Sequence, residues 1–195
     1  MKLQEEKTLV LIKPDGVKRG LVGEIIRRAE QRGLKIVALR MFQATRSELE
    51  KHYSSSEENL KVMGEKTIAN YEKYGMDILK AVGTNDSLVL GKQVHSWILD
   101  FMTSGPIVKI IVQGIHAVEM MRKLVGNTIP AQAEMGTIRG DFSVDSAILA
   151  NAQKRGIRNL VHASGTIAEA EKEIALWFTE EEFCAYVRAE EDVMF

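Results

Sequence analysis

The segment Arg158-Asn159-Leu160-Val161-His162-Ala163-Ser164-Gly165 joins a short apolar run to a turn of small residues, and a helical pattern follows from Thr166. The pair Leu160-Val161 is typical of a buried strand. We therefore expect His162 at the end of that strand, where its imidazole is open to a ligand. A neutral imidazole is a good nucleophile, and its unperturbed pKa of about 6.5 keeps it largely neutral at the pH of the cell. A single histidine in a turn is more often a packing residue, so the meaning of His162 depends on the rest of the chain.

The other strands and helices are read from the apolar spacing, which alternates between strand character and helical periodicity. Strands are expected at 8–12, 34–42, 107–112 and 160–161, and the run at 88–90 also has strand character. Helices are expected at 21–32, 45–53, 64–80, 94–102, 116–124, 144–153, 167–174 and 183–187, with an irregular loop at 126–140. This order predicts an α+β fold of the ferredoxin-like βαββαβ kind, with an antiparallel sheet covered by helices.

Composition excludes several classes of protein. A chain of 195 residues with 45% hydrophobic residues is most simply one globular domain. A net charge of −1 argues against a nucleic-acid binder, and an aromatic content of 6% argues against an RNA-binding sheet of the same topology. The single Cys184 excludes an internal disulfide and suits a reducing compartment. No run reaches the roughly eighteen apolar residues of a membrane span, so we expect a cytoplasmic protein without a membrane partner.

The first strand ends in a position that a hydrophobic core does not favour. Lys13 follows the apolar run at 8–12, and Pro14-Asp15-Gly16 forms the turn that stops it. A lysine at a strand end, like a histidine at another, is available to a ligand.

Six blocks in this order, of which the last is the helix that follows His162, resemble nucleoside diphosphate kinase, and they span the chain apart from two longer segments. They are Lys13-Pro14-Asp15-Gly16-Val17, Arg19-Gly20-Leu21-Val22-Gly23, Ser104-Gly105-Pro106, Gly136-Thr137-Ile138-Arg139-Gly140-Asp141-Phe142, Asn159-Leu160-Val161-His162-Ala163-Ser164 and Glu169-Ala170-Glu171-Lys172-Glu173-Ile174-Ala175-Leu176-Trp177-Phe178. Matched blocks in order are far more specific than any one of them.

The resemblance implies reversible transfer of the γ-phosphoryl group from a nucleoside triphosphate to a nucleoside diphosphate. The reaction is ping-pong through a phosphohistidine, with Mg²⁺ on the nucleotide phosphates rather than on protein ligands. His162 matches the family nucleophile, and Glu173 matches the carboxylate that receives the other ring N–H and fixes the tautomer. Ser164 is retained beside the nucleophile, so its hydroxyl can bond to Glu173.

The resemblance also implies which residues hold the nucleotide. Lys13, Arg122 and Arg139 match phosphate-contacting cations, and Arg139 offers a bidentate fork. Further matches are Thr128 as a hydroxyl donor, Asn159 at the ribose and Tyr53 near the nucleophile. His52 and His116 are expected to be structural, and His95 has no assigned role.

Two segments depart from compact family members. We expect a single domain over 1–195 with insertions at about 56–96 and 143–156, both bordering the nucleotide site or an oligomer interface. The aromatic residue that clamps the base has no secure match; Val94, His95, Trp97 and Phe101 are candidates from one anchor, and Val62 is the candidate from another. Met135 stands where a proline is usual, so both a hexamer and a tetramer remain open for the expected homo-oligomer.

An active enzyme is favoured over a binding module that kept the fold and lost turnover. A degenerate member of the family would have lost Lys13, Arg139 or His162, and all three are present.

Overall fold

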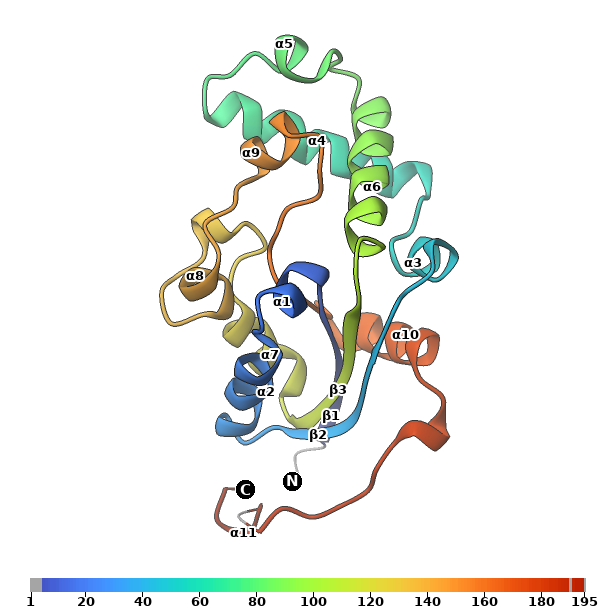
Figure 1. The fold of residues 1–195 in the computed structure, drawn as a ribbon, viewed down its shortest axis with the longest axis vertical. Helices are drawn as coiled ribbons and strands as arrows, with labels where there is room; N and C mark the ends of the chain where they lie inside the picture. Colours follow the sequence, from blue (N-terminus) through green and yellow to red (C-terminus); the bar gives the residue numbers. More distant parts are fainter. Residues whose placement is uncertain (1–4, 190, 195) are drawn as a thin grey trace.

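The computed structural model describes residues 5–189 and 191–194. Its centre is an antiparallel sheet of four strands in the spatial order β2-β3-β1-β4 (Figure 1). The strands are β1 (Glu5–Ile12), β2 (Lys35–Phe42), β3 (Ile107–Ile115) and β4 (Val161–Ala163). This arrangement confirms the predicted ferredoxin-like α+β fold.

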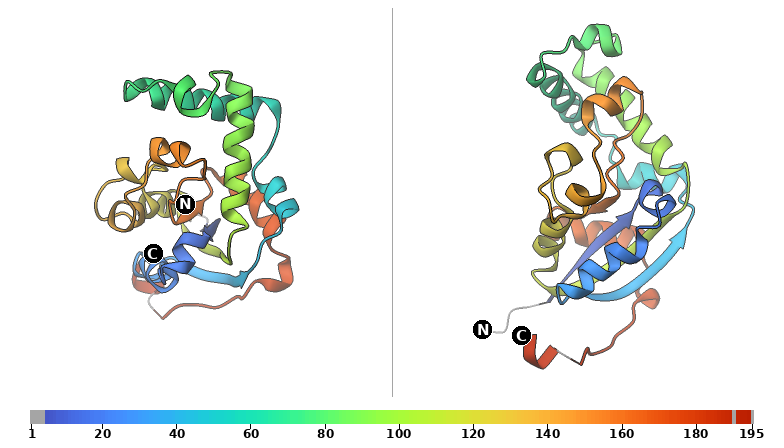
Figure 2. Two further views of the ribbon diagram at one scale, coloured as in Figure 1. Left: turned by 45° about the horizontal axis from the view of Figure 1, so that its top comes forward. Right: turned by 60° about the vertical axis from the view of Figure 1, so that its left-hand side comes forward.

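Alternating side chains of the strands divide the core into two layers. On β1, Val10 and Ile12 pack with helices α2 and α7, whereas Leu9 and Leu11 pack with α3, α10 and the end of α6. The sheet therefore lies between two helical layers (Figure 2). The covering helices are α1 (Pro14–Lys18), α2 (Val22–Gln31), α3 (Arg46–His52), α7 (Ala117–Val125), α8 (Ile138–Phe142) and α10 (Ile167–Trp177).

The segment at 126–140 is less irregular than predicted. It contains the 3₁₀ helix η1 (Pro130–Gln132) and the start of α8, whose N-terminus is capped by the hydroxyl of Thr137 on the N–H of Gly140. Such a cap satisfies a donor that the helix itself leaves open.

The segment between α3 and β3 forms helices that extend beyond one end of the sheet (Figures 1 and 2). They are α4 (Glu57–Lys73), α5 (Ile78–Val82) and α6 (Ser87–Met102), and α9 (Ala147–Ala152) contacts α4 and α5. The helical pattern at 64–80, in which Gly75 is an expected interruption, forms two helices, because Gly75 has φ +62° and the chain turns there; α4 also begins earlier than predicted, at Glu57. The strand character assigned to 88–90 is wrong, because Asp86 caps a helix that includes this run.

Glycine allows α4 and α6 to touch backbone to backbone. A Cβ added at Gly64 would lie 1.8 Å from the carbonyl oxygen of Ser87, and one added at Gly91 would lie 1.8 Å from that of Leu60. Both contacts are impossible for a larger residue unless the helices separate.

The helix predicted at 183–187 is not formed. This segment runs beside β2, where the N–H of Cys184 donates to the carbonyl of Val37 at 2.7 Å. The edge strand thus supplies an acceptor that competes with helix formation. Short helical turns lie on either side, η2 (Glu180–Glu182) and α11 (Glu191–Met194). Within the described residues, no helix is long and apolar enough to cross a membrane.

The close contact at Gly91 predicts that alanine destabilises the protein there but not at an open glycine such as Gly23. We expect Gly91→Ala to lower the free energy of unfolding by about 1–3 kcal/mol, since the added methyl group meets backbone that cannot yield cheaply. Gly23→Ala in α2 is the control, because its Cβ would meet no atom within 4 Å; there we expect no loss and a gain of up to about 1 kcal/mol. Urea unfolding followed by circular dichroism measures both, and equal midpoints for the two variants would contradict the contact.

Candidate active site

His162 is the central residue of β4, and the alternation of that short strand sets its direction. Its neighbours Val161 and Ala163 belong to the core that faces α2 and α7. His162 pairs with Leu11 across the sheet and so lies on the opposite face, toward α3 and α10.

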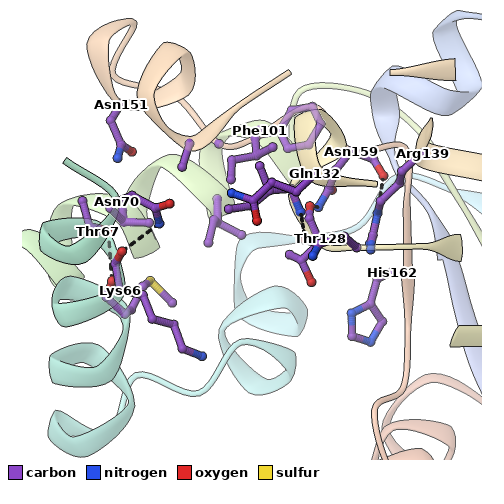
Figure 3. Close-up of a pocket in the computed structure, with 18 of the residues that line it drawn as sticks. Lys66, Thr67, Asn70, Phe101, Thr128, Gln132, Arg139, Asn151, Asn159 and His162 are labelled. Carbon is purple, nitrogen blue, oxygen red and sulfur yellow. Dashed lines mark hydrogen bonds between the residues drawn. The ribbon is translucent and has the colours of Figure 1, made fainter. Parts of the chain in front are cut away.

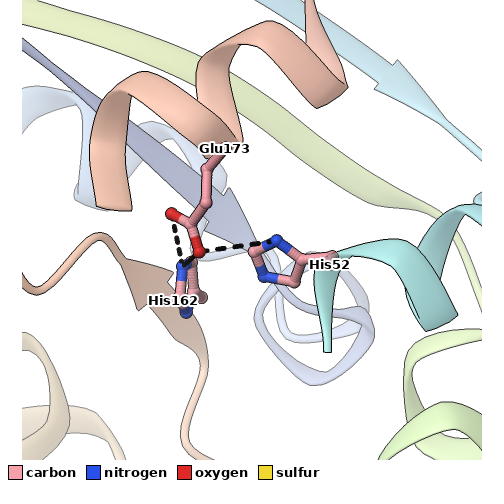
Figure 4. Close-up of side chains that lie close together, drawn as sticks. All are labelled: His52, His162 and Glu173. Carbon is pink, nitrogen blue, oxygen red and sulfur yellow. Dashed lines mark hydrogen bonds and ion pairs between the residues drawn. The ribbon is translucent and has the colours of Figure 1, made fainter. Parts of the chain in front are cut away.

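The imidazole of His162 is held by a carboxylate on α10 (Figure 4). Its Nε2 lies 2.9 Å and 3.0 Å from the two carboxylate oxygens of Glu173. The hydroxyl of Ser164 donates to Oε2 of the same carboxylate at 2.6 Å. Because a carboxylate only accepts, Nε2 carries the proton and the lone pair of Nδ1 is left free.

Burial keeps this imidazole neutral. The pKa of His162 is lowered from its usual range to about 3, first by burial and then by the positive charge of Lys13 and, less strongly, Arg139. Burial raises the pKa of Glu173, while His52 and the hydrogen bond from Ser164 act in the opposite direction. A neutral, oriented imidazole with a free Nδ1 is prepared for nucleophilic attack.

Lys13 is joined to the loop before β4. Its Nζ donates to Oδ1 of Asn159 at 2.7 Å, and the amide nitrogen of Asn159 donates to the carbonyl of Thr128 at 2.8 Å. Burial, followed by the charge of Arg139, lowers the pKa of Lys13 to about 8. The Asn159 amide is thus already engaged on both sides.

Arg139 brings positive charge to the cleft and also binds three backbone carbonyls. It donates to the carbonyls of Asn159 at 3.0 Å, Gly126 at 2.9 Å and Val161 at 2.5 Å. The guanidinium has five N–H groups, so two remain for a ligand. The predicted free fork is therefore partly occupied. Burial, and then the charge of Arg122, lower the pKa of Arg139 to about 10.

The residue between two of those carbonyls is strained. Leu160 has φ +67°, a left-handed conformation that a bulky residue rarely adopts. The N–H of Lys13 donates to its carbonyl at 2.8 Å, and its own N–H donates to Asp15 at 3.0 Å. Asp15 was not among the predicted site residues; its signal was its place in the Pro-Asp-Gly turn directly after Lys13.

His52 was predicted to be structural, yet it lies against the central pair. Its ring centroid is 4.6 Å from that of His162, and its Nδ1 lies 3.5 Å from Glu173. The indole N–H of Trp177 donates to the same Nδ1 at 3.1 Å, so this nitrogen is an acceptor and the ring is neutral. Burial is the first cause that lowers the pKa of His52 to about 3. Only the fold reveals this, because α3 and β4 are distant in sequence.

Seven of the predicted site residues line one cleft of about 790 Å³ (Figure 3). They are Lys13, Tyr53, Arg122, Thr128, Arg139, Asn159 and His162. Glu173 and Ser164 stand behind His162 instead. The hydroxyl of Tyr53 is buried without a partner among the described residues, and burial raises its pKa.

Both longer segments contribute to this cleft. Of the five candidates for a base clamp, Val94 and Phe101 are among its lining residues. His95 instead places Nε2 2.9 Å from the carbonyl of Tyr53, which ties α6 to the end of α3. Lining residues from α4 and α9 were not predicted, since nothing in their sequence marks them as ligand-facing.

Comparison with known proteins identifies the family. The family model of nucleoside diphosphate kinase matches residues 6–74 and 88–183. The chain belongs to the nucleoside diphosphate kinase family. It is 51% identical over 177 residues to the nucleoside diphosphate kinase of Pyrobaculum aerophilum, covering 91% of this chain and 97% of that one, and 38% identical over 187 residues to that of Archaeoglobus fulgidus, covering 96% and 95%.

Solved structures agree with this family. An NDP kinase from P. aerophilum superposes with a TM-score of 0.87 at 49% identity, covering 92% of this chain and 98% of that one. A transition-state mimic of nucleoside-diphosphate kinase from Borrelia burgdorferi, with bound vanadate and ADP, has a TM-score of 0.77 at 33% identity and covers 97% and 96%. The resemblance drawn from the sequence is confirmed.

The protonation of His162 can be measured directly. We expect ¹⁵N NMR to show its imidazole as the neutral Nε2–H tautomer at pH 5, because its pKa is lowered to about 3, whereas a free imidazole is mostly protonated there. In Glu173→Gln the amide can accept from or donate to Nε2, so we expect a mixture of tautomers.

Glu171→Gln is the matched control, on the same helix and exposed. It should leave the His162 signals unchanged. A protonated His162 at pH 5 in the wild-type protein would overturn the assignment.

Proposed function

We propose that this protein is a nucleoside diphosphate kinase that forms a phosphohistidine on His162. It transfers the γ-phosphoryl group of a nucleoside triphosphate such as ATP to a nucleoside diphosphate, and so maintains nucleoside triphosphate pools. The observation that carries this proposal is the hydrogen bond from Nε2 of His162 to Glu173, which leaves Nδ1 unprotonated beside Lys13 and Arg139.

The chemistry follows from these groups. Nδ1 of His162 attacks the γ-phosphorus, an N–P bond forms, and the bond to the bridging oxygen breaks, leaving a nucleoside diphosphate. The proton on Nε2 stays in place, and Glu173 stabilises the positive charge that develops on the ring. A second nucleoside diphosphate reverses these steps and carries the phosphoryl group away.

Cations in the cleft stabilise the charge on the transferred group. Lys13 and Arg122 supply positive charge, and Arg139 supplies its two remaining N–H groups. The hydroxyls of Thr128 and Tyr53 are further donors; that of Tyr53 has no partner among the described residues. Asn159, between Lys13 and Thr128, is the residue we assign to the ribose.

The residues present suit Mg²⁺ carried by the nucleotide rather than held by protein. His52, His162 and Glu173 bring ligand atoms within 4.8 Å of one another, but two of them are nitrogen donors already engaged by Trp177 and Glu173. Mg²⁺ prefers oxygen ligands and keeps several waters. When bound to the phosphates it neutralises part of their charge.

Three further expectations accompany the proposal. The chain is one domain over 1–195, with insertions at about 56–96 and 143–156; residues 1–4, 190 and 195 lie outside the described part. We assign it to the cytoplasm, since its single Cys184 suits a reducing compartment. We also expect a homo-oligomer, either a hexamer or a tetramer.

A phosphoenzyme is the decisive test. Intact-protein mass after mixing with ATP and magnesium should show one acid-labile phosphate on the wild-type protein, discharged by adding a nucleoside diphosphate. His162→Asn should carry none, with transfer reduced by about 10⁴-fold or more. His116→Asn, at an exposed histidine outside the cleft, should behave as wild type. An adduct that persists in His162→Asn would mean a different nucleophile, and nucleotide binding without any adduct would indicate a binding module.

The lowered pKa of Lys13 predicts how the rate of phosphoryl transfer falls at alkaline pH. Its pKa is lowered to about 8, so it is charged below that pH and loses its charge as the pH rises through it. We expect kcat/KM for ATP to fall above that pH. Lys13→Arg, whose guanidinium stays charged, should be about tenfold slower at its maximum but keep that maximum to higher pH. The same alkaline decline in both proteins would exclude Lys13 as its source.

A further inference from the structure

The last turn of α10 places two side chains against the end of α3. Glu173 and Trp177 are four residues apart on α10, so they lie on the same face of that helix. Both are buried, and both reach His52, the last residue of α3. His52 is thus in contact with the carboxylate that holds His162 and also with an indole N–H.

One oxygen of Glu173, Oε1, is within reach of two histidines (Figure 4). Nε2 of His162 lies 2.9 Å from it, and Nδ1 of His52 lies 3.5 Å from it. The other oxygen, Oε2, accepts from the hydroxyl of Ser164 at 2.6 Å. If Nδ1 of His52 carried a proton, it could donate to Oε1 and compete with His162 for the same carboxylate.

Trp177 sets which nitrogen of His52 carries the proton. Its indole nitrogen can only donate and lies 3.1 Å from Nδ1, so Nδ1 accepts and the proton of the neutral ring is on Nε2. Nε2 is buried and has no hydrogen-bond partner among the described residues. An unpaired buried donor costs free energy, and a proton on Nδ1 would instead be paired with Glu173. The indole N–H opposes that change, because it occupies the lone pair of Nδ1.

Packing and a backbone contact hold the indole in this orientation. The ring of Phe42 lies against it, with ring centroids 5.7 Å apart and an interplanar angle of 63°. The carbonyl of Trp177 accepts a hydrogen bond from Nζ of Lys109. The donor to His52 is therefore fixed through both its ring and its backbone.

We propose that Trp177 is a positioning residue for the nucleophile: by donating to Nδ1 of His52, it reserves the Glu173 carboxylate for His162. Trp177 does not line the cleft, so it acts through these other side chains. This inference rests on the proposed function, since the role is to prepare His162 for attack. Without the indole N–H, His52 donates to Oε1, and the bond that keeps the proton of His162 on Nε2 weakens. Part of the population then carries that proton on Nδ1, the attacking nitrogen.

The tautomers can be read by ¹⁵N NMR of the full-length protein near neutral pH. In the wild-type protein we expect a neutral His52 with its proton on Nε2. In Trp177→Phe, which keeps an aromatic ring but lacks the N–H, we expect the proton of His52 on Nδ1 and a mixture of tautomers for His162. A proton on Nδ1 of His52 in the wild-type protein overturns the proposal, whether or not the variant folds. Unchanged tautomers in Trp177→Phe overturn it too.

Kinetics separates this role from one in packing. We expect Trp177→Phe to lower kcat about tenfold and to leave KM for ATP within about twofold of the wild-type value, because the groups that contact the nucleotide are unchanged. The double variant Trp177→Phe/His52→Phe also lacks the competing donor and should regain most of the lost kcat. An unchanged kcat in Trp177→Phe, or a loss that the double variant does not regain, contradicts the proposal.

Phe42→Leu is the matched control, because it loosens the packing of the same indole and keeps its N–H. It should lower the free energy of unfolding but keep the wild-type tautomers and kcat. A changed tautomer of His52 in Phe42→Leu would assign the effect to packing and overturn the proposal. Because the tautomers are read without turnover, failure to form a phosphohistidine would refute the proposed function separately.

Discussion

The hydrogen bond between Nε2 of His162 and the carboxylate of Glu173 joins the last strand of the sheet to the helix that follows it. It exists because β4 alternates, so that the histidine faces α10 while its neighbours face the other core layer. Thr166 caps that helix and Ser164 donates to the same carboxylate, which fixes both partners. The proton on Nε2 and the free lone pair of Nδ1 follow from this bond, whereas burial keeps the ring neutral.

Hydrogen bonds to backbone carbonyls hold the positive charge of Arg139 close to that bond. Arg139 uses three N–H groups to hold the carbonyls on either side of Leu160 and at Gly126. This contact stabilises the left-handed residue that turns the chain into β4. The same guanidinium therefore shapes the strand that carries His162 and supplies charge beside it. These two roles explain why Arg139 is buried here, although burial removes its charge from water at a cost in free energy.

Local sequence predicted the parts whose cause is local. The strand runs and the helix that begins after Thr166 are encoded within short segments, whereas the pairing of His162 with Glu173 was expected from the resemblance to the family. The error at 88–90 has a local cause, the cap that Asp86 supplies to α6, whereas the error at 183–187 is tertiary, because the edge of β2 draws that segment into an extended path. The position of His52 was missed because only the packing of α3 brings it against His162 and Glu173.

The backbone contact between α4 and α6 determines how the far wall of the cleft is attached to the central sheet. Since α6 leads directly into β3, the helices that form the far wall are anchored to the central sheet through one continuous element (Figure 1). Because β3 pairs with β1 and β1 pairs with β4, the far wall of the cleft is coupled to the strand of His162 through two pairs of strands.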